Sequence, residues 1–181
     1  MLVVDSVRRL VSASVFLCGL MVVSVSAQQP ETITFADGAY SLEIPTAWVA
    51  QPPRSPIIQY EFKIPADDGP DGRVTMMGAG GSIKANLDRW IGQFEGGEHT
   101  VKVEEVADSK VHQLDATGVF QDRPRGPFNP PVPRDGYRML AAIIETPNHG
   151  NFFVKVYGPS SLIEGAEPAF AELIQSLQHV K

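Results

Sequence analysis

Short stretches in which apolar and polar residues alternate dominate the chain, and alternation with a period of two predicts β-strands. The clearest pair lies at residues 32–35 and 39–44, on either side of the dipeptide Asp37-Gly38. Alternation around an Asp-Gly dipeptide is typical of a β-hairpin. Further strands are expected at residues 57–64, 73–77, 100–106, 110–120, 137–146 and 152–157.

A different pattern, in which apolar positions recur three or four residues apart, predicts a helix in the middle of the chain. Its large apolar side chains fall on one stripe and are Ile83, Leu87, Trp90, Ile91 and Phe94. Ser82 is a suitable N-cap, and Gly96-Gly97 are expected to end the helix. A single apolar stripe implies that this helix covers an apolar surface.

The C-terminal part of the chain predicts a second helix of the same kind. Phe170, Leu173, Ile174 and Leu177 share a stripe, and Pro168 suits the first turn. The chain thus contains two main helices and about seven strands, which occur mostly as neighbouring hairpins. This pattern indicates an α+β fold in which helices cover a largely antiparallel sheet.

The order of these elements and several short apolar signatures resemble the PsbP-like superfamily. The resembling segments are residues 40–45 (YSLEIP) followed by Trp48, the helix at 83–94, residues 150–159 (GNFFVKVYGP) and the C-terminal helix. The resemblance covers most of residues 32–180. It implies an α/β/α sandwich around the antiparallel sheet and a non-enzymatic binding or assembly role, and it transfers no functional residue.

Residues 1–27 have the pattern of a signal peptide. Arg8 and Arg9 precede an uncharged, largely apolar run that ends in the small residues Ser26 and Ala27. Cleavage there leaves residues 28–181 as a single domain and directs it to a secreted or periplasmic location. Two alternatives remain open, because the run could stay as an uncleaved membrane anchor or Cys18 could be a lipidation site.

Charge and residue content argue against several classes of function. The chain has 15 Lys and Arg against 21 Asp and Glu, and this net charge of −6 is unsuited to nucleic-acid binding. The only cysteine, Cys18, belongs to the predicted signal peptide, so the rest of the chain has no thiolate metal site. The four histidines and Asp67, Asp68 and Asp71 lack the spacing of zinc or calcium motifs, and residues 78–82 lack that of a nucleotide-binding loop. We therefore predict no metal ion and no cofactor.

The most unusual stretch is the predicted loop at residues 123–136 (RPRGPFNPPVPRDG), which is rich in proline and arginine within an acidic chain. Long loops on rigid scaffolds often bind partners, and a Pro-rich segment is extended and loses little entropy on docking. Arg123, Arg125, Phe128 and Arg134 are the candidate partner-binding residues. The alternative is a solvated loop in which Phe128 folds back on the domain.

These observations favour an exported, non-catalytic binding or assembly domain, with a protein partner and no membrane contact after signal cleavage. The alternative is a carrier of a small apolar ligand, in which Met76, Met77 and Trp90 would line a pocket. A hydrolase that uses His112 and Asp115 ranks last, because no nucleophile motif is present.

Overall fold

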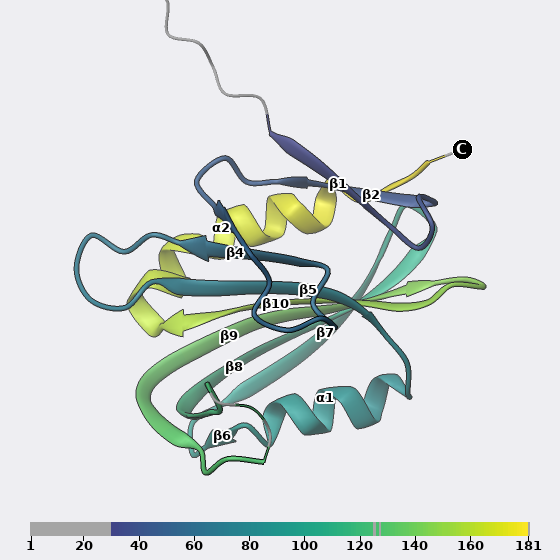
Figure 1. Cartoon of the computed structure of the whole chain (residues 1–181). Helices are drawn as coiled ribbons and strands as arrows, with labels where there is room; N and C mark the ends of the chain where they lie inside the picture. Colours follow the sequence, from purple (N-terminus) through teal and green to yellow (C-terminus); the bar gives the residue numbers. More distant parts are fainter. Residues whose placement is uncertain (1–29, 125, 127, 181) are drawn as a thin grey trace, which may run out of the picture.

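The computed structural model describes residues 30–124, 126 and 128–180. A large antiparallel sheet forms the middle layer, with helix α1 (Ile83–Ile91) on one side (Figure 1). Helix α2 (Ser160–Gln175) and a small three-stranded sheet cover the other side. This arrangement confirms the expected α+β fold and the α/β/α sandwich.

Every strand pairing in the large sheet is antiparallel. The strand order is β3-β4-β5-β10-β9-β8-β6, and β7 pairs with the part of β8 that β6 leaves uncovered. The strands are β3 (Val49–Gln51), β4 (Tyr60–Ile64), β5 (Gly72–Ala79), β6 (Phe94–Glu95), β7 (His99–Val106), β8 (Ser109–Asp122), β9 (Val132–Thr146) and β10 (Gly150–Pro159).

The small sheet contains the predicted N-terminal hairpin. Strands β1 (Glu31–Phe35) and β2 (Tyr40–Ile44) pair antiparallel, and the short C-terminal strand β11 (Gln178–His179) adds to β2. Asp37 and Gly38 both have positive φ in the turn, which is why this dipeptide marks the hairpin.

Two apolar cores lie on the two faces of the large sheet. The core on the α2 side contains the fully buried Leu42, Val74, Met76, Phe152, Leu173 and Ile174. The core on the α1 side contains Leu87, Trp90, Leu114, Met139, Ile143 and Phe153. Alternation along the strands supplies both cores, because successive residues point to opposite faces.

Several predicted boundaries are wrong. Helix α1 ends at Ile91 with Gly92 as its C-cap, so Phe94 lies in β6 and the pair Gly96-Gly97 does not end the helix. Phe94 nevertheless packs on the same core, with its ring centroid 5.2 Å from that of Phe120. The short strands β3, β6 and β11 were not predicted, because two or three residues are too few to show alternation.

Helix α2 begins earlier than predicted. It starts at Ser160, directly after Pro159, and Pro168 lies inside it instead of in its first turn. Pro168 removes the hydrogen bond to the carbonyl of Glu164, and both residues are on the exposed face of the helix. The freed carbonyl is therefore open to water, which lowers the cost of an internal proline.

The predicted signal peptide, residues 1–27, lies outside the described residues. Across residues 30–124, 126 and 128–180, the two helices are too short or too polar to cross a membrane.

Candidate functional site

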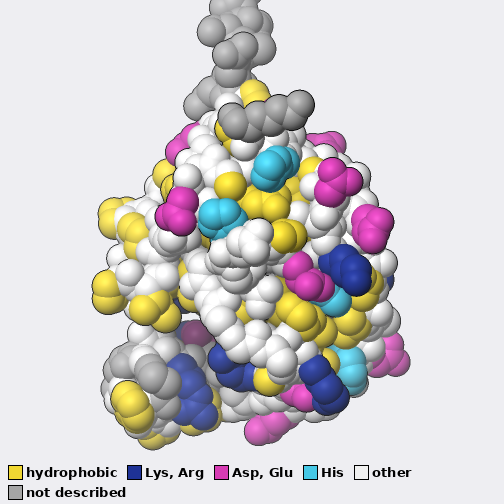
Figure 2. All heavy atoms as spheres, turned by 90° about the vertical axis from the view of Figure 1, so that its right-hand side faces the viewer, with side chains coloured by type: hydrophobic (Ala, Val, Ile, Leu, Met, Phe, Trp, Pro, Cys, Tyr) yellow, Lys and Arg dark blue, Asp and Glu magenta, His cyan; other side chains and the backbone are white. Residues whose placement is uncertain are grey.

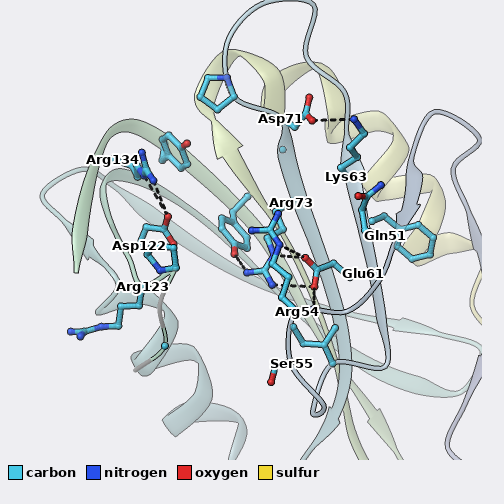
Figure 3. Close-up of a pocket in the computed structure, with 18 residues that line it drawn as sticks. Gln51, Arg54, Ser55, Glu61, Lys63, Asp71, Arg73, Asp122, Arg123 and Arg134 are labelled. Carbon is cyan, nitrogen blue, oxygen red and sulfur yellow. Dashed lines mark hydrogen bonds and ion pairs between the residues drawn. The ribbon is translucent and has the colours of Figure 1, made fainter. Parts of the chain in front are cut away.

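A polar cleft of about 630 Å³ opens on the large sheet, on the same side as α1 (Figure 3). Strands β4, β5 and the end of β10 form its floor. The loop of residues 52–59 forms one wall, and the ends of β8 and β9 form the other, together with Arg123, Pro124 and Gly126 of the loop of residues 123–131. A volume of this size suits a small molecule or several side chains of a partner.

The floor of the polar cleft is organised around the buried carboxylate of Glu61, whose side chain is 1% exposed. Arg73 donates to both carboxylate oxygens, at 2.8 Å from Nε and 3.1 Å from a terminal nitrogen. Arg54 donates its backbone N–H at 2.9 Å and pairs through Nε at 3.1 Å. Strand register builds this cluster, because Arg73 lies opposite Lys63 on β4 and opposite Tyr157 on β10.

The pKa values in this cluster follow from burial and pairing. Burial alone would raise the pKa of Glu61, but hydrogen bonds from Arg73 and Arg54 and their charges hold it below its usual value. Arg73 also donates to the Tyr157 hydroxyl at 2.7 Å. Burial raises the pKa of Tyr157 despite the neighbouring guanidinium. At neutral pH the floor is therefore an ionised carboxylate beneath two arginines, beside a protonated tyrosine.

Further charged pairs line the cleft around this cluster. Arg134 on β9 lies 3.4 Å from the carboxylate of Asp122 on β8. Lys63 and Asp71 pair at 3.2 Å at another edge of the cleft. The face shown in Figure 2 carries Lys and Arg side chains at mid-height and below, with acidic side chains among and around them. In the lining of the cleft, by contrast, the basic side chains outnumber the acidic ones.

Lys155 on β10 lies beside the floor, on the side of α1. Its Nζ donates to the side-chain oxygen of Gln93 at 2.9 Å and lies 5.6 Å from the ring centroids of both Trp90 and Tyr157. Burial, and then the charges of Arg89 and Arg73, lower the pKa of Lys155 to about 7.

Replacing Lys155 with Met tests this environment. Because the pKa of Lys155 falls from 10.5 to about 7 on folding, the unfolded chain binds more protons between these values. The free energy of unfolding should therefore rise with pH across that range in the natural protein and rise less in Lys155→Met. Urea unfolding at a series of pH values measures both slopes, and equal slopes would contradict the assignment.

The structure places two of the predicted partner-binding residues on the polar cleft. Arg123 and Arg134 both line it, and the guanidinium of Arg123 donates to the carbonyl of Asn129 at 2.7 Å within the loop. Phe128 is 100% exposed, so the alternative in which it folds back on the domain is wrong. Arg125 lies outside the described residues.

The Pro-rich loop is shorter than predicted. Residues 132–136 belong to β9, and Val132, Pro133 and Arg134 pair with the end of β8. β10 ends opposite Tyr137, so this part of β9 has β8 as its neighbour and no strand on its other side among those described. A proline at position 133 is compatible with such an edge.

The residues proposed for the alternative functions are dispersed. Met76 belongs to the α2-side core, whereas Met77 and Trp90 lie on the α1 side, so the three residues do not line one pocket. His112 pairs with Glu145 at 2.6 Å. Asp115 pairs with Arg138 at 2.7 Å instead of with His112.

The other sequence candidates have structural roles. Ser82 caps α1 by accepting from the Ala85 N–H, and Gly81 has positive φ in the preceding turn. Asp71 accepts from the backbone N–H of Ala66 at 3.0 Å and so holds its own turn.

The solved structures similar to this chain include two with TM-scores above 0.5. One is the solution structure of cyanobacterial PsbP (CyanoP) from Synechocystis sp. PCC 6803, with a TM-score of 0.54 and 11% identity, covering 87% of this chain and 96% of that one. The chain has a PsbP-like fold. The second is the crystal structure of LpqN, involved in cell envelope biogenesis of Mycobacterium tuberculosis. It has a TM-score of 0.56 and 10% identity, and the match covers 84% of this chain and 91% of LpqN. The sequence matches no protein-family model and no curated protein.

Within this PsbP-like fold, the sequence predicted one wall of the polar cleft but not its floor. Glu61, Arg73 and Tyr157 come from three strands, and only the sheet register brings them together. Each stands at an ordinary polar position of an alternating strand. One available signal was that Glu61 and Lys63 alternate with the buried Phe62 and Ile64, which places both charges on one face.

Proposed function

We propose that this protein is an exported, non-catalytic binding domain that engages a protein partner at the polar cleft and the loop of residues 123–131. The observation that supports this proposal most is that Phe128 is fully exposed on the loop of residues 123–131, which also contributes to one wall of a cleft rich in arginine. An exposed aromatic beside arginines is the composition typical of interface anchors. The envelope role stated for LpqN, a structural neighbour, supports a location outside the cytoplasm.

Site-specific photo-crosslinking tests this proposal in the native host. A photoreactive amino acid replaces Phe128, and the same amino acid replaces Val103 as the control, because Val103 is also an exposed apolar residue at 57% but lies on β7. We expect a discrete crosslinked species from position 128 and not from position 103. Mass spectrometry identifies the partner, and the same spectrum should show a chain that begins at Gln28.

A second variant separates the loop from the sheet. Residues 124–131 are replaced by a Gly/Ser segment of equal length, which leaves the β9 residues from Val132 in place. We expect this variant to fold and to lose the partner. Equal crosslinking from both positions, or an unchanged partner after the loop replacement, would contradict the proposal.

A further inference from the structure

The floor of the polar cleft offers hydrogen-bond donors to a ligand, because its own acceptor atoms already accept hydrogen bonds within the protein. Both oxygens of Glu61 already accept from Arg73 and Arg54. The hydroxyl oxygen of Tyr157 accepts from Arg73, which leaves its own proton to donate to a ligand. Arg54 uses its backbone N–H and Nε for Glu61, which leaves the terminal nitrogens of a 71% exposed side chain to donate.

Such a surface selects ligands by their chemistry. A ligand group on this floor has to supply oxygen acceptors, and charge strengthens each hydrogen bond from an arginine. Carboxylate fits this requirement, because guanidinium groups bind it in a planar, two-bonded geometry. Glu61 contributes by fixing two guanidiniums in place before a ligand arrives, so less side-chain freedom is lost on binding.

The side chains that line the cleft carry an excess of positive charge. Its cations are Arg54, Lys63, Arg73, Arg123 and Arg134, and its anions are Glu61, Asp71 and Asp122. The whole chain has a net charge of −6, so this excess is a local feature. Arg89 adds a further positive charge on the side of α1, where it donates to the amide oxygen of Asn86.

The two loops that supply the walls each also expose a large apolar side chain outside the lining of the cleft. Phe128 is 100% exposed in one wall loop, and Ile57 is 69% exposed in the other. A free inorganic anion makes no favourable contact with these apolar side chains, whereas a peptide segment brings apolar side chains next to its acidic ones. The donor-rich floor together with the exposed apolar side chains of the two loops therefore favours a polypeptide ligand.

We infer that the polar cleft binds an acidic, extended segment of a protein partner, with one carboxylate at Arg54 and Tyr157, where the loop of residues 52–59 meets the floor, and a second carboxylate at Arg134. This inference rests on the proposed function and names the chemistry of its partner. Arg54 and Arg134 come from opposite walls, so the segment crosses the cleft from wall to wall.

Fluorescence anisotropy with a defined peptide tests the inference. The probe is a fluorescein-labelled peptide of about ten residues, long enough to cross the cleft, in which Glu alternates with Ser around a central Leu. The matched control peptide has Gln at each Glu. We expect the acidic peptide to bind, the Gln peptide not to bind, and moderate salt to weaken binding by about tenfold.

Protein variants locate the peptide. Arg54→Gln and Arg134→Gln should each weaken binding by about fivefold or more. Lys110→Gln is the control, because it removes the same charge from an exposed position on β8 outside the lining of the cleft. Thermal unfolding of each variant confirms that it is folded.

Three outcomes would overturn the inference. These are equal binding of the two peptides, unchanged binding by Arg54→Gln and Arg134→Gln, and binding of inorganic phosphate alone without binding of the acidic peptide. Failure here is distinguishable from failure of the proposed function. A crosslinked partner at Phe128 without peptide binding would contradict only the inference of an acidic segment. Peptide binding without any crosslink would contradict the proposed contact with a native partner at Phe128.

Discussion

Replacing Trp90 with Ala is expected to lower the free energy of unfolding by about 3 kcal/mol or more, because truncation of a buried aromatic leaves a cavity. Trp90 is 3% exposed and lies on the last turn of α1. Its ring packs edge-on against Phe153 of β10 at 5.1 Å between centroids. Urea unfolding followed by circular dichroism measures the loss.

The control for this prediction is Lys84→Ala on the opposite face of the same helix. The Lys84 side chain is 85% exposed and pairs with Asp88 across one helical turn. Loss of that pair costs about 0.5 kcal/mol or less, and alanine favours the helix. If Trp90→Ala were no more destabilising than Lys84→Ala, α1 would not be held on the sheet by its apolar stripe.

The fold was largely predictable because its strongest signals are local. The hairpin of β1 and β2 follows from alternation around Asp37-Gly38. The buried face of α1 follows from the spacing of Leu87 and Trp90. In both cases the residues that determine the element are neighbours in sequence, so periodicity alone reveals them.

The misplaced boundaries arise where tertiary structure overrides a local rule. Pro133 and Gly136 suggest a loop, yet they extend β9 because its end pairs on one side only. Pro168 suggests a helix start, yet α2 continues through it. Pro168 lies on the exposed face of the helix, so water can donate a hydrogen bond to the carbonyl that the proline leaves without a donor. Neither outcome can be read from the proline itself.

The floor of the polar cleft was beyond sequence reasoning for a different reason. Arg73 and Tyr157 are separated by 84 positions, and their hydrogen bond depends on the pairing of β5 with β10. The loop of residues 123–131 was recognisable because its composition is unusual. The floor residues are individually unremarkable, and their function depends on which strands become neighbours.

Glu61→Gln is expected to be the most damaging single change in the floor. The neutral amide leaves the guanidiniums of Arg73 and Arg54 without a carboxylate, and its NH₂ group faces donors. Removal of one member of a buried ion pair costs about 3 kcal/mol or more, because the remaining charge stays desolvated. The matched control is Asp88→Asn, which breaks an exposed pair and should cost about 0.5 kcal/mol or less.

The pH dependence of stability distinguishes the lost charge from lost packing. The pKa of Glu61 lies below its ordinary value of 4.5 in the folded protein, so its contribution is complete above pH 4.5 and disappears as the pH falls through the lowered value. Glu61→Gln should remove this part of the acid dependence, and a variant with an unchanged acid profile would contradict it.

The double variant Glu61→Leu/Arg73→Met should recover much of the lost stability, because apolar residues of similar size need no partner. Such recovery would show that the stability of the fold does not require the buried ion pair, which leaves the positioning of Arg54 beside the floor as the role that the Glu61 carboxylate retains.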